Sequence, residues 1–213
     1  MVAAARRTAE ILWDIGAVNF NAKNPFTLTS GAQSPVYIDC RKIISFLSER
    51  RAITGMAADM LGNIPADYIA GGETAGISYA AWISDALSKP MLYVRKKPKG
   101  FGKGSQIEGA FFEGARVLLV EDLTTDGGSK IAFVNALREA GAVVTDVFSV
   151  FYYGIFPQDV FVNAGLKLHY LSTWKDVLGV ARDRALFSGD DLTEVERFLA
   201  SPATWGQSRA AAG

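Results

Sequence analysis

The chain has 213 residues, 49% hydrophobic and 21% charged, which is typical of a globular protein and sufficient for one α/β domain. Basic residues (Lys and Arg) and acidic residues (Asp and Glu) both number 22, so the overall charge indicates no nucleic-acid partner. The single cysteine and single histidine exclude an intrachain disulfide and a metal site made of several thiolates or imidazoles.

Strand and helix patterns alternate along the chain. Helical spacing predicts helices at 4–14, 48–61, about 75–87, about 130–141, 172–182 and 190–199. Short apolar runs predict strands at 67–70, 91–94, 117–120, 143–151 and 167–171. The segment 26–42 is expected to form a hairpin, and Asp190 or Asp191 to cap the last helix. This alternation indicates an α/β fold with a doubly wound, mainly parallel sheet flanked by helices.

The sequence also bounds the location and domain structure of the protein. No apolar run approaches the roughly 20 residues that cross a bilayer. The start, MVAAARRTAE, lacks the apolar segment of a signal peptide. We therefore expect a cytoplasmic protein with no membrane partner. No repeat, linker or second core is evident, which predicts a single domain over 1–213 with a frayed tail from about 201.

The stretch 117–130 carries most of the predicted chemistry. Its apolar run is a buried strand that ends at the adjacent carboxylates of Glu121 and Asp122. The loop 124–129 offers two glycines, hydroxyls from both threonines and the serine, and a helix N-terminus, all of which favour a phosphate. Paired carboxylates suit ribose hydroxyls and a sugar that becomes cationic in the transition state. The alternative is a solvated acidic pair followed by an ordinary turn.

Two further segments are candidates for anion binding. The loop 95–103 contains five basic residues among glycines: Arg95, Lys96, Lys97, Lys99 and Lys103. A mobile basic loop of this kind suits a lid over a compact polyanion such as diphosphate. A solvated surface run and contacts with nucleic-acid phosphates are the alternatives, and the balanced net charge disfavours the second. The loop 71–76 is either a second anion loop or a plain turn, while His169 is expected to be structural and Cys40 to have no chemical role.

Taken together, these motifs strongly resemble those of the orotate phosphoribosyltransferases. The resemblance rests on SGAQSPVYIDCRK, YVRKKPKGFG and LLVEDLTTDGGS, and it spans roughly residues 10–180. The acidic-pair motif marks the wider type I phosphoribosyltransferases, and the first two motifs narrow the match to the orotate enzymes. The chain is most similar to an alphaproteobacterial-like subgroup that shares GGETAGI, FYYGIF and LHY-TW.

The resemblance implies a fold, a reaction and partners. The fold is a parallel sheet flanked by helices, with a small hood over about residues 1–45. The reaction moves a phosphoribosyl group from 5-phosphoribosyl 1-diphosphate to orotate in UMP synthesis, giving orotidine 5′-phosphate and diphosphate. Mg²⁺ would bridge the diphosphate and ribose oxygens. A homodimer is implied, in which the basic loop reaches over the neighbouring subunit's site.

The resemblance also implies roles for residues of this chain. Residues implied to bind phosphoribosyl diphosphate are Arg95, Lys96, Lys99, Glu121, Asp122, Leu123, Thr124, Thr125, Asp126, Gly127, Gly128 and Ser129. Those implied to lie beside orotate are Ser30, Gly31, Tyr37, Ile38, Thr125 and Tyr153. The pyrophosphate loop comprises Gly72, Glu73, Thr74, Ala75 and Gly76. Lys99, Glu121 and Asp122 would be catalytic, with Lys99 stabilising the leaving group and the two carboxylates contacting Mg²⁺ mostly through substrate and water.

Several positions depart from the family pattern. Thr29 and Ala75 stand where relatives carry lysine, Phe101 where many carry histidine, and Tyr153 where many carry a ring-binding arginine. Asp126 adds a carboxylate to the phosphate loop, and we expect its side chain to point away from the anion. These departures leave two alternatives open: a type I transferase for another nucleobase, and a non-enzymatic regulator that senses phosphoribosyl diphosphate.

Overall fold

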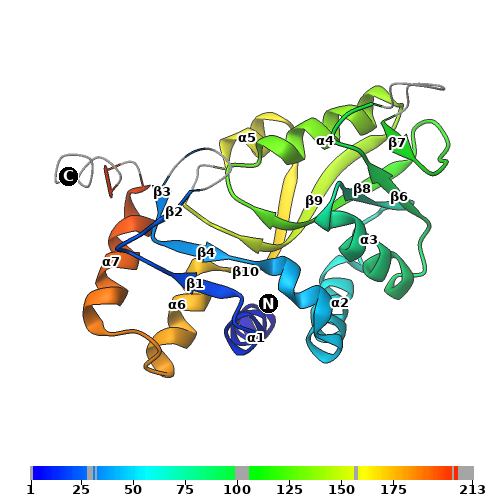
Figure 1. Cartoon of the computed structure of the whole chain (residues 1–213). Coiled ribbons are helices and arrows are strands. Elements are labelled where there is room, and N and C mark those ends of the chain that lie inside the picture. Colours follow the sequence, from blue (N-terminus) through cyan, green and yellow to red (C-terminus); the bar gives the residue numbers. More distant parts are fainter. Residues whose placement is uncertain are drawn as a thin grey trace.

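The computed structural model of the chain describes residues 2–27, 31, 33–98, 106–155, 158–202 and 204–205. Its centre is a six-stranded sheet in the order β10-β9-β8-β5-β6-β7, in which β7 pairs antiparallel with β6 and the other neighbours pair in parallel (Figure 1). The strands are β5 (Tyr68–Gly72), β6 (Met91–Val94), β7 (Ile107–Glu108), β8 (Arg116–Thr124), β9 (Val143–Tyr152) and β10 (Lys167–Thr173). The predicted mainly parallel sheet is confirmed, and the sequence analysis missed β7.

Helices cover both faces of this sheet. Figure 1 shows α4 (Gly128–Glu139) and α5 (Asp159–Asn163) above it, with α1 (Val2–Asp14), α2 (Leu47–Leu61) and α6 (Trp174–Asp183) below. Alternate residues of β8 point to opposite faces, so Leu118 and Val120 enter one buried cluster while Val117 and Leu119 enter the other. The first cluster also takes residues of α3 (Ala75–Ala86) and α7 (Gly189–Ala200). The doubly wound architecture is therefore confirmed.

The N-terminal segment adds two small antiparallel pairs. β2 (Phe26–Thr27) pairs with β3 (Gln33–Ser34), so a hairpin is present where 26–42 predicted one. The next strand, β4 (Val36–Ile38), pairs instead with β1 (Val18–Phe20), which is too short to show a periodicity in the sequence. The segment then enters a 3₁₀ helix, η1 (Cys40–Ser45), rather than continuing as a strand.

Two predictions near the C-terminus are wrong. Helix α7 is capped by Ser188, whose Oγ accepts a hydrogen bond from the Asp191 backbone N–H at 3.2 Å, so neither predicted aspartate is the cap. The predicted start of a frayed tail at residue 201 is wrong, since Trp205 is 1% exposed and its Nε1 donates to Glu194 at 2.6 Å, while residues 206–213 of the predicted tail lie outside the described residues. The indole packs on Phe198 of α7 with ring centroids 5.4 Å apart, which ties Trp205 to that helix. Within the described ranges, no helix has both the length and the apolar character that a membrane span requires.

The order of connections determines where a ligand can bind. The chain leaves β5 through α3 to reach β6 on one side, and leaves β8 through α4 to reach β9 on the other side. Neighbouring strands β5 and β8 therefore form the topological switch point, because their outgoing helices diverge to opposite faces of the sheet. Open α/β sheets place ligands in the crevice at the carboxyl ends of such strands.

Candidate active site

A cavity of about 960 Å³ lies at this switch point. Its wall comes from the N-terminal segment with β2, β4 and η1, from the loop after β5, and from the end of β8 with the start of α4. Lys96, which follows β6, and Gln106, which precedes β7, also line it. Tyr153, directly after β9, adds a further wall. The structure thus brings together all three anion-binding segments that the sequence predicted, except for the part of the basic loop beyond residue 98, which lies outside the described residues.

The acidic pair lies inside β8 rather than just beyond its end. Glu121 is 5% exposed, and its Oε1 is buried without a hydrogen-bond partner among the described residues. Burial raises the pKa of Glu121 to about 8, and the nearby Lys130 ammonium, 3.8 Å from Oε2, opposes that rise. Burial also raises the pKa of Asp122, whose Oδ1 accepts the Leu123 backbone N–H at 2.8 Å. The pair is therefore a desolvated carboxylate site whose ionised form gains from any bound cation.

The loop after β5 packs directly against this pair. A Cβ added at Gly72 would lie 1.7 Å from Glu121 Oε1, and one at Gly76 would lie 2.6 Å from the Val120 carbonyl oxygen. Only glycine allows the loop backbone to approach β8 this closely. Glu73, Thr74 and Ala75 line the cavity, whereas Gly72 and Gly76 form its buried support. The loop is therefore held firmly beside the acidic pair, and its role as a second anion loop stays a prediction.

The loop at the start of α4, the predicted anion cradle, borders the cavity, but two of the predictions made for its side chains are wrong. Thr125, Gly128 and Ser129 line the cavity, but Thr124 is fully buried and its hydroxyl pairs with Ser149 of β9. The prediction that Thr124 offers its hydroxyl to a phosphate is therefore wrong. The expectation that Asp126 points away is also wrong, because its Oδ1 accepts the Gly128 backbone N–H at 3.1 Å. The Asp126 carboxylate therefore accepts a hydrogen bond from one of the backbone N–H groups at the N-terminus of α4.

The basic residues divide between two directions. Lys96 lines the cavity, and its backbone N–H donates to Glu73 Oε2 at 2.7 Å, which ties the start of the basic loop to the loop after β5. Arg95 does not line the cavity, and its guanidinium lies 3.6 Å from Glu108 Oε1 instead. The structure therefore does not bring Arg95 to the position predicted for it. Lys99 and Phe101 lie outside the described residues.

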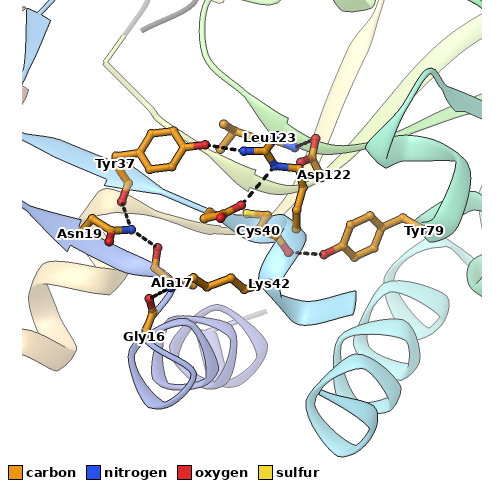
Figure 2. A network of polar contacts seen from close by, with 11 residues as sticks. Gly16, Ala17, Asn19, Tyr37, Cys40, Lys42, Tyr79, Asp122 and Leu123 are labelled. Carbon is orange, nitrogen blue, oxygen red and sulfur yellow. Dashed lines mark hydrogen bonds and ion pairs between the residues drawn. The ribbon is translucent and has the colours of Figure 1, made fainter. Parts of the chain in front are cut away.

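Aromatic side chains from the N-terminal segment and from the end of β9 form part of the cavity wall. Tyr37, Ile38 and Tyr153 line the cavity, and the Tyr37 hydroxyl accepts a hydrogen bond from Arg41 Nη2 at 2.8 Å (Figure 2). Gly31 is exposed and does not line the cavity, while Ser30 lies outside the described residues. A flat apolar wall beside a polar floor suits a heterocyclic base stacked next to a sugar.

Two cavity cations were missed by the sequence analysis. Arg41 lines the cavity beside Tyr37, and Lys130 lies in the first turn of α4 at 8% exposure. Arg41 belongs to the motif SGAQSPVYIDCRK and Lys130 ends the stretch 117–130, but neither segment indicates by itself where these side chains point. Arg41 and Asp122 lie close enough for each charge to shift the other's pKa.

The structure is consistent with a structural role for His169 and with no chemical role for Cys40. His169 Nε2 lies 2.7 Å from Asp146 Oδ1, on the neighbouring strand β9 and away from the cavity. Cys40 touches the cavity, but burial raises the pKa of its thiol well above the ordinary value, which disfavours a nucleophilic thiolate. Its carbonyl accepts the Tyr79 hydroxyl at 2.7 Å (Figure 2), a contact that joins η1 to α3.

The doubly wound sheet, with an acidic pair and two glycine-containing loops at its switch point, is the arrangement of a phosphoribosyltransferase. No family model matches the chain. It is 53% identical to the orotate phosphoribosyltransferase of Allorhizobium ampelinum over 207 residues, covering 94% of this chain and 90% of that protein. It is also 53% identical to the Ruegeria sp. orotate phosphoribosyltransferase over 210 residues, with 96% and 93% covered. The crystal structure of the Aeropyrum pernix orotate phosphoribosyltransferase superposes with a TM-score of 0.72 at 29% identity, covering 84% of this chain and 99% of that one. The chain belongs to the orotate phosphoribosyltransferase family.

Proposed function

We propose that this protein transfers the phosphoribosyl group of 5-phosphoribosyl 1-diphosphate to orotate, forming orotidine 5′-phosphate and diphosphate in UMP synthesis. One observation carries the proposal: the cavity joins a carboxylate pair, two anion loops and an aromatic wall around one space of about 960 Å³. A phosphorylated sugar with a diphosphate leaving group and a planar acceptor needs these surfaces together.

The geometry supports a catalytic division of labour. Thr125, Gly128 and Ser129 would hold the 5′-phosphate at the N-terminus of α4, where the helix dipole favours an anion. Glu121 and Asp122 would orient the ribose hydroxyls and stabilise positive charge that develops on the sugar ring. Lys96 and the sequence-predicted Lys99 would stabilise the departing diphosphate. No side chain needs to form a covalent bond, so catalysis is positional and electrostatic.

Mg²⁺ is proposed as the cofactor, and the donor set fits it. Glu121 and Asp122 are hard oxygen ligands with room beside them in the cavity. Among the described residues no group of three or more His, Cys, Asp or Glu side chains could hold a metal, so substrate oxygens and water would complete its coordination. When bound, Mg²⁺ would supply positive charge to the diphosphate and ribose oxygens and would favour the ionised form of the buried carboxylates.

The wider organisation remains part of the proposal. We assign residues 1–213 to one domain in which the first 45 or so form a hood, because Phe26, Thr27 and Tyr37 line the cavity from the N-terminal segment. We also propose a cytoplasmic homodimer that shares the basic loop between subunits, without a nucleic-acid or membrane partner.

Product formation with different acceptors tests the proposal. Purified protein, Mg²⁺ and phosphoribosyl diphosphate are incubated with orotate, uracil, adenine or hypoxanthine, and diphosphate release and nucleotide formation are measured. We expect turnover with orotate. Turnover with a purine alone would favour the transferase for another base, and ligand binding without diphosphate release would favour the regulator.

A variant pair shows whether the activity belongs to this cavity. Asp122→Asn removes a charge that faces the ribose, and it should lower kcat/KM by about 10²-fold. Asp183→Asn is the control, because it removes an exposed carboxylate paired with Arg6 outside the cavity. Equal activity of the two variants would place the reaction elsewhere.

A further inference from the structure

We propose that Arg41 binds the carboxylate of the acceptor base and thereby makes the enzyme select an acidic pyrimidine over a neutral one. The inference rests on the proposed function, since it assigns the acceptor side of the same cavity. The family resemblance did not single out this residue.

The cationic side chains that line the cavity lie on different walls. Among the described residues that line it, the cationic side chains are Arg41, Lys96 and Lys130. Lys130 is buried and committed to the sugar side, with its Nζ 3.8 Å from Glu121 Oε2 and 3.2 Å from Ser129 Oγ. Lys96 follows β6 and is tied through its backbone to the loop after β5. Arg41 is the described cation on the remaining wall.

Two hydrogen bonds orient the Arg41 guanidinium. Its Nη2 donates to the Tyr37 hydroxyl at 2.8 Å, and its Nε donates to Asp39 Oδ1 at 3.2 Å. These two contacts hold the planar group beside Tyr37, while the side chain lines the cavity and remains 60% exposed. A planar guanidinium can form two parallel hydrogen bonds to a carboxylate, which a lysine ammonium cannot reproduce.

The proposed ligands bring several anionic groups into the cavity. The sugar diphosphate presents a phosphate and a diphosphate, for which the cavity has the α4 cradle and the Lys96 side. An acidic pyrimidine adds a third anionic group, and four carboxylates already line the cavity: Glu73, Glu121, Asp122 and Asp126. A ligand carboxylate on the aromatic wall therefore needs a cation of its own, and Arg41 lies there.

If Arg41 had a purely structural role, replacing it would lower the thermal midpoint, and the structure argues against such a role. Its ion pair with Asp39 is exposed at 60% and 24% of the two side chains, and such pairs contribute little to stability. Replacing Arg41 should therefore leave the thermal midpoint nearly unchanged. A role in ribose binding through Asp122 would instead appear as weaker binding of every nucleotide, whether or not its base carries a carboxylate.

The test compares two ligands that differ in this carboxylate alone. Binding of orotidine 5′-phosphate and of uridine 5′-phosphate is measured by calorimetry for the wild type, Arg41→Gln, Arg41→Lys and the control Arg184→Gln. Arg184 forms a similar exposed ion pair, 2.6 Å from Asp14, but does not line the cavity. We expect Arg41→Gln to weaken orotidine 5′-phosphate binding about 10–100-fold, as for loss of a charge-assisted hydrogen-bond pair, and to change uridine 5′-phosphate binding less than about twofold. Arg41→Lys should recover part of the loss, and Arg184→Gln should match the wild type.

Two results would overturn the inference. Unchanged orotidine 5′-phosphate affinity in Arg41→Gln would remove the carboxylate contact, and an equal loss for both nucleotides would assign Arg41 to the ribose side. Orotate turnover by the wild type is measured in parallel. If that turnover is present, either result refutes the Arg41 assignment alone. If it is absent, the proposed function fails and the acceptor assignment fails with it.

Discussion

The close packing of the loop after β5 on β8 gives a sharp prediction for Gly72→Ala. The added methyl carbon would lie 1.7 Å from Glu121 Oε1 and 2.6 Å from the Phe133 ring, whereas unstrained contacts begin near 3.4 Å. Either the carboxylate or the loop must move by more than 1 Å, and Phe133 of α4 blocks one direction of escape. The substitution therefore perturbs both the core and the acidic pair.

The expected magnitudes follow from that displacement. Overpacking of a close-packed site destabilises by about 1–3 kcal/mol, which corresponds to a thermal midpoint lower by roughly 2–12 °C in a protein of this size. A shift of about 1 Å in a group that orients substrate lowers kcat/KM by about 10²-fold. We therefore expect a folded but weakly active protein, with the loss measured against phosphoribosyl diphosphate at a temperature below both midpoints.

Gly55→Ala is the matched control. Gly55 lies within α2, and a Cβ added there meets nothing within 4 Å. Alanine should stabilise that helix by about 0.5–1 kcal/mol and leave kcat/KM unchanged. If Gly72→Ala behaved like Gly55→Ala in both the thermal midpoint and kcat/KM, the argument that the loop positions Glu121 by backbone contact would be refuted.

Three further predictions concern single charges. The folded-state pKa of Glu121 is about 8 against 4.5 for the free side chain, so its contribution to stability is present below pH 4.5 and is lost as pH rises toward 8. Urea unfolding should show the wild type losing up to about 4 kcal/mol relative to Glu121→Gln between about pH 5 and pH 8, and a pH-independent difference would contradict the burial argument. Asp126→Asn removes the charge that competes for the Gly128 N–H, so KM for phosphoribosyl diphosphate should fall about 2–5-fold; a rise would show that the carboxylate assists binding. Lys99→Ala should lower kcat by about 10²–10³-fold at an unchanged thermal midpoint, and a near-normal kcat would remove its assigned role.

Local patterns were sufficient for the sheet and for the position of its chemistry. Apolar runs joined by helical segments predicted β5, β6, β8, β9 and β10, and the apolar run that leads into two carboxylates pointed to the part of β8 that lines the cavity. Both the apolar runs and the carboxylate pair are patterns of residues that are neighbours in the sequence, so they can be recognised without knowledge of the fold. Strands of two or three residues, such as β1 and β7, were not predicted because they are too short to show a periodicity and are defined by pairing with another strand.

Side-chain direction was the main source of error. Thr124 and Thr125 are adjacent hydroxyl residues, yet Ser149 of the neighbouring strand binds the first, and the second lines the cavity. Arg95 and Lys96 separate in the same way, since Glu108 lies beside the first. The partner that decides each direction is distant in sequence, so no motif could reveal it.

The sequence by itself determined that the protein has a mainly parallel α/β sheet with a carboxylate pair and glycine-containing loops near its strand ends, since strand pattern and loop composition are local properties. Only the tertiary structure decided the environment of those groups. The approach of Gly72 and Gly76 to β8 buries Glu121 and raises its pKa, and the fold of the N-terminal segment brings Arg41 beside Tyr37 at the mouth of the same cavity. Burial and charge pairing depend on segments far apart in the chain, because desolvation is a property of the assembled site.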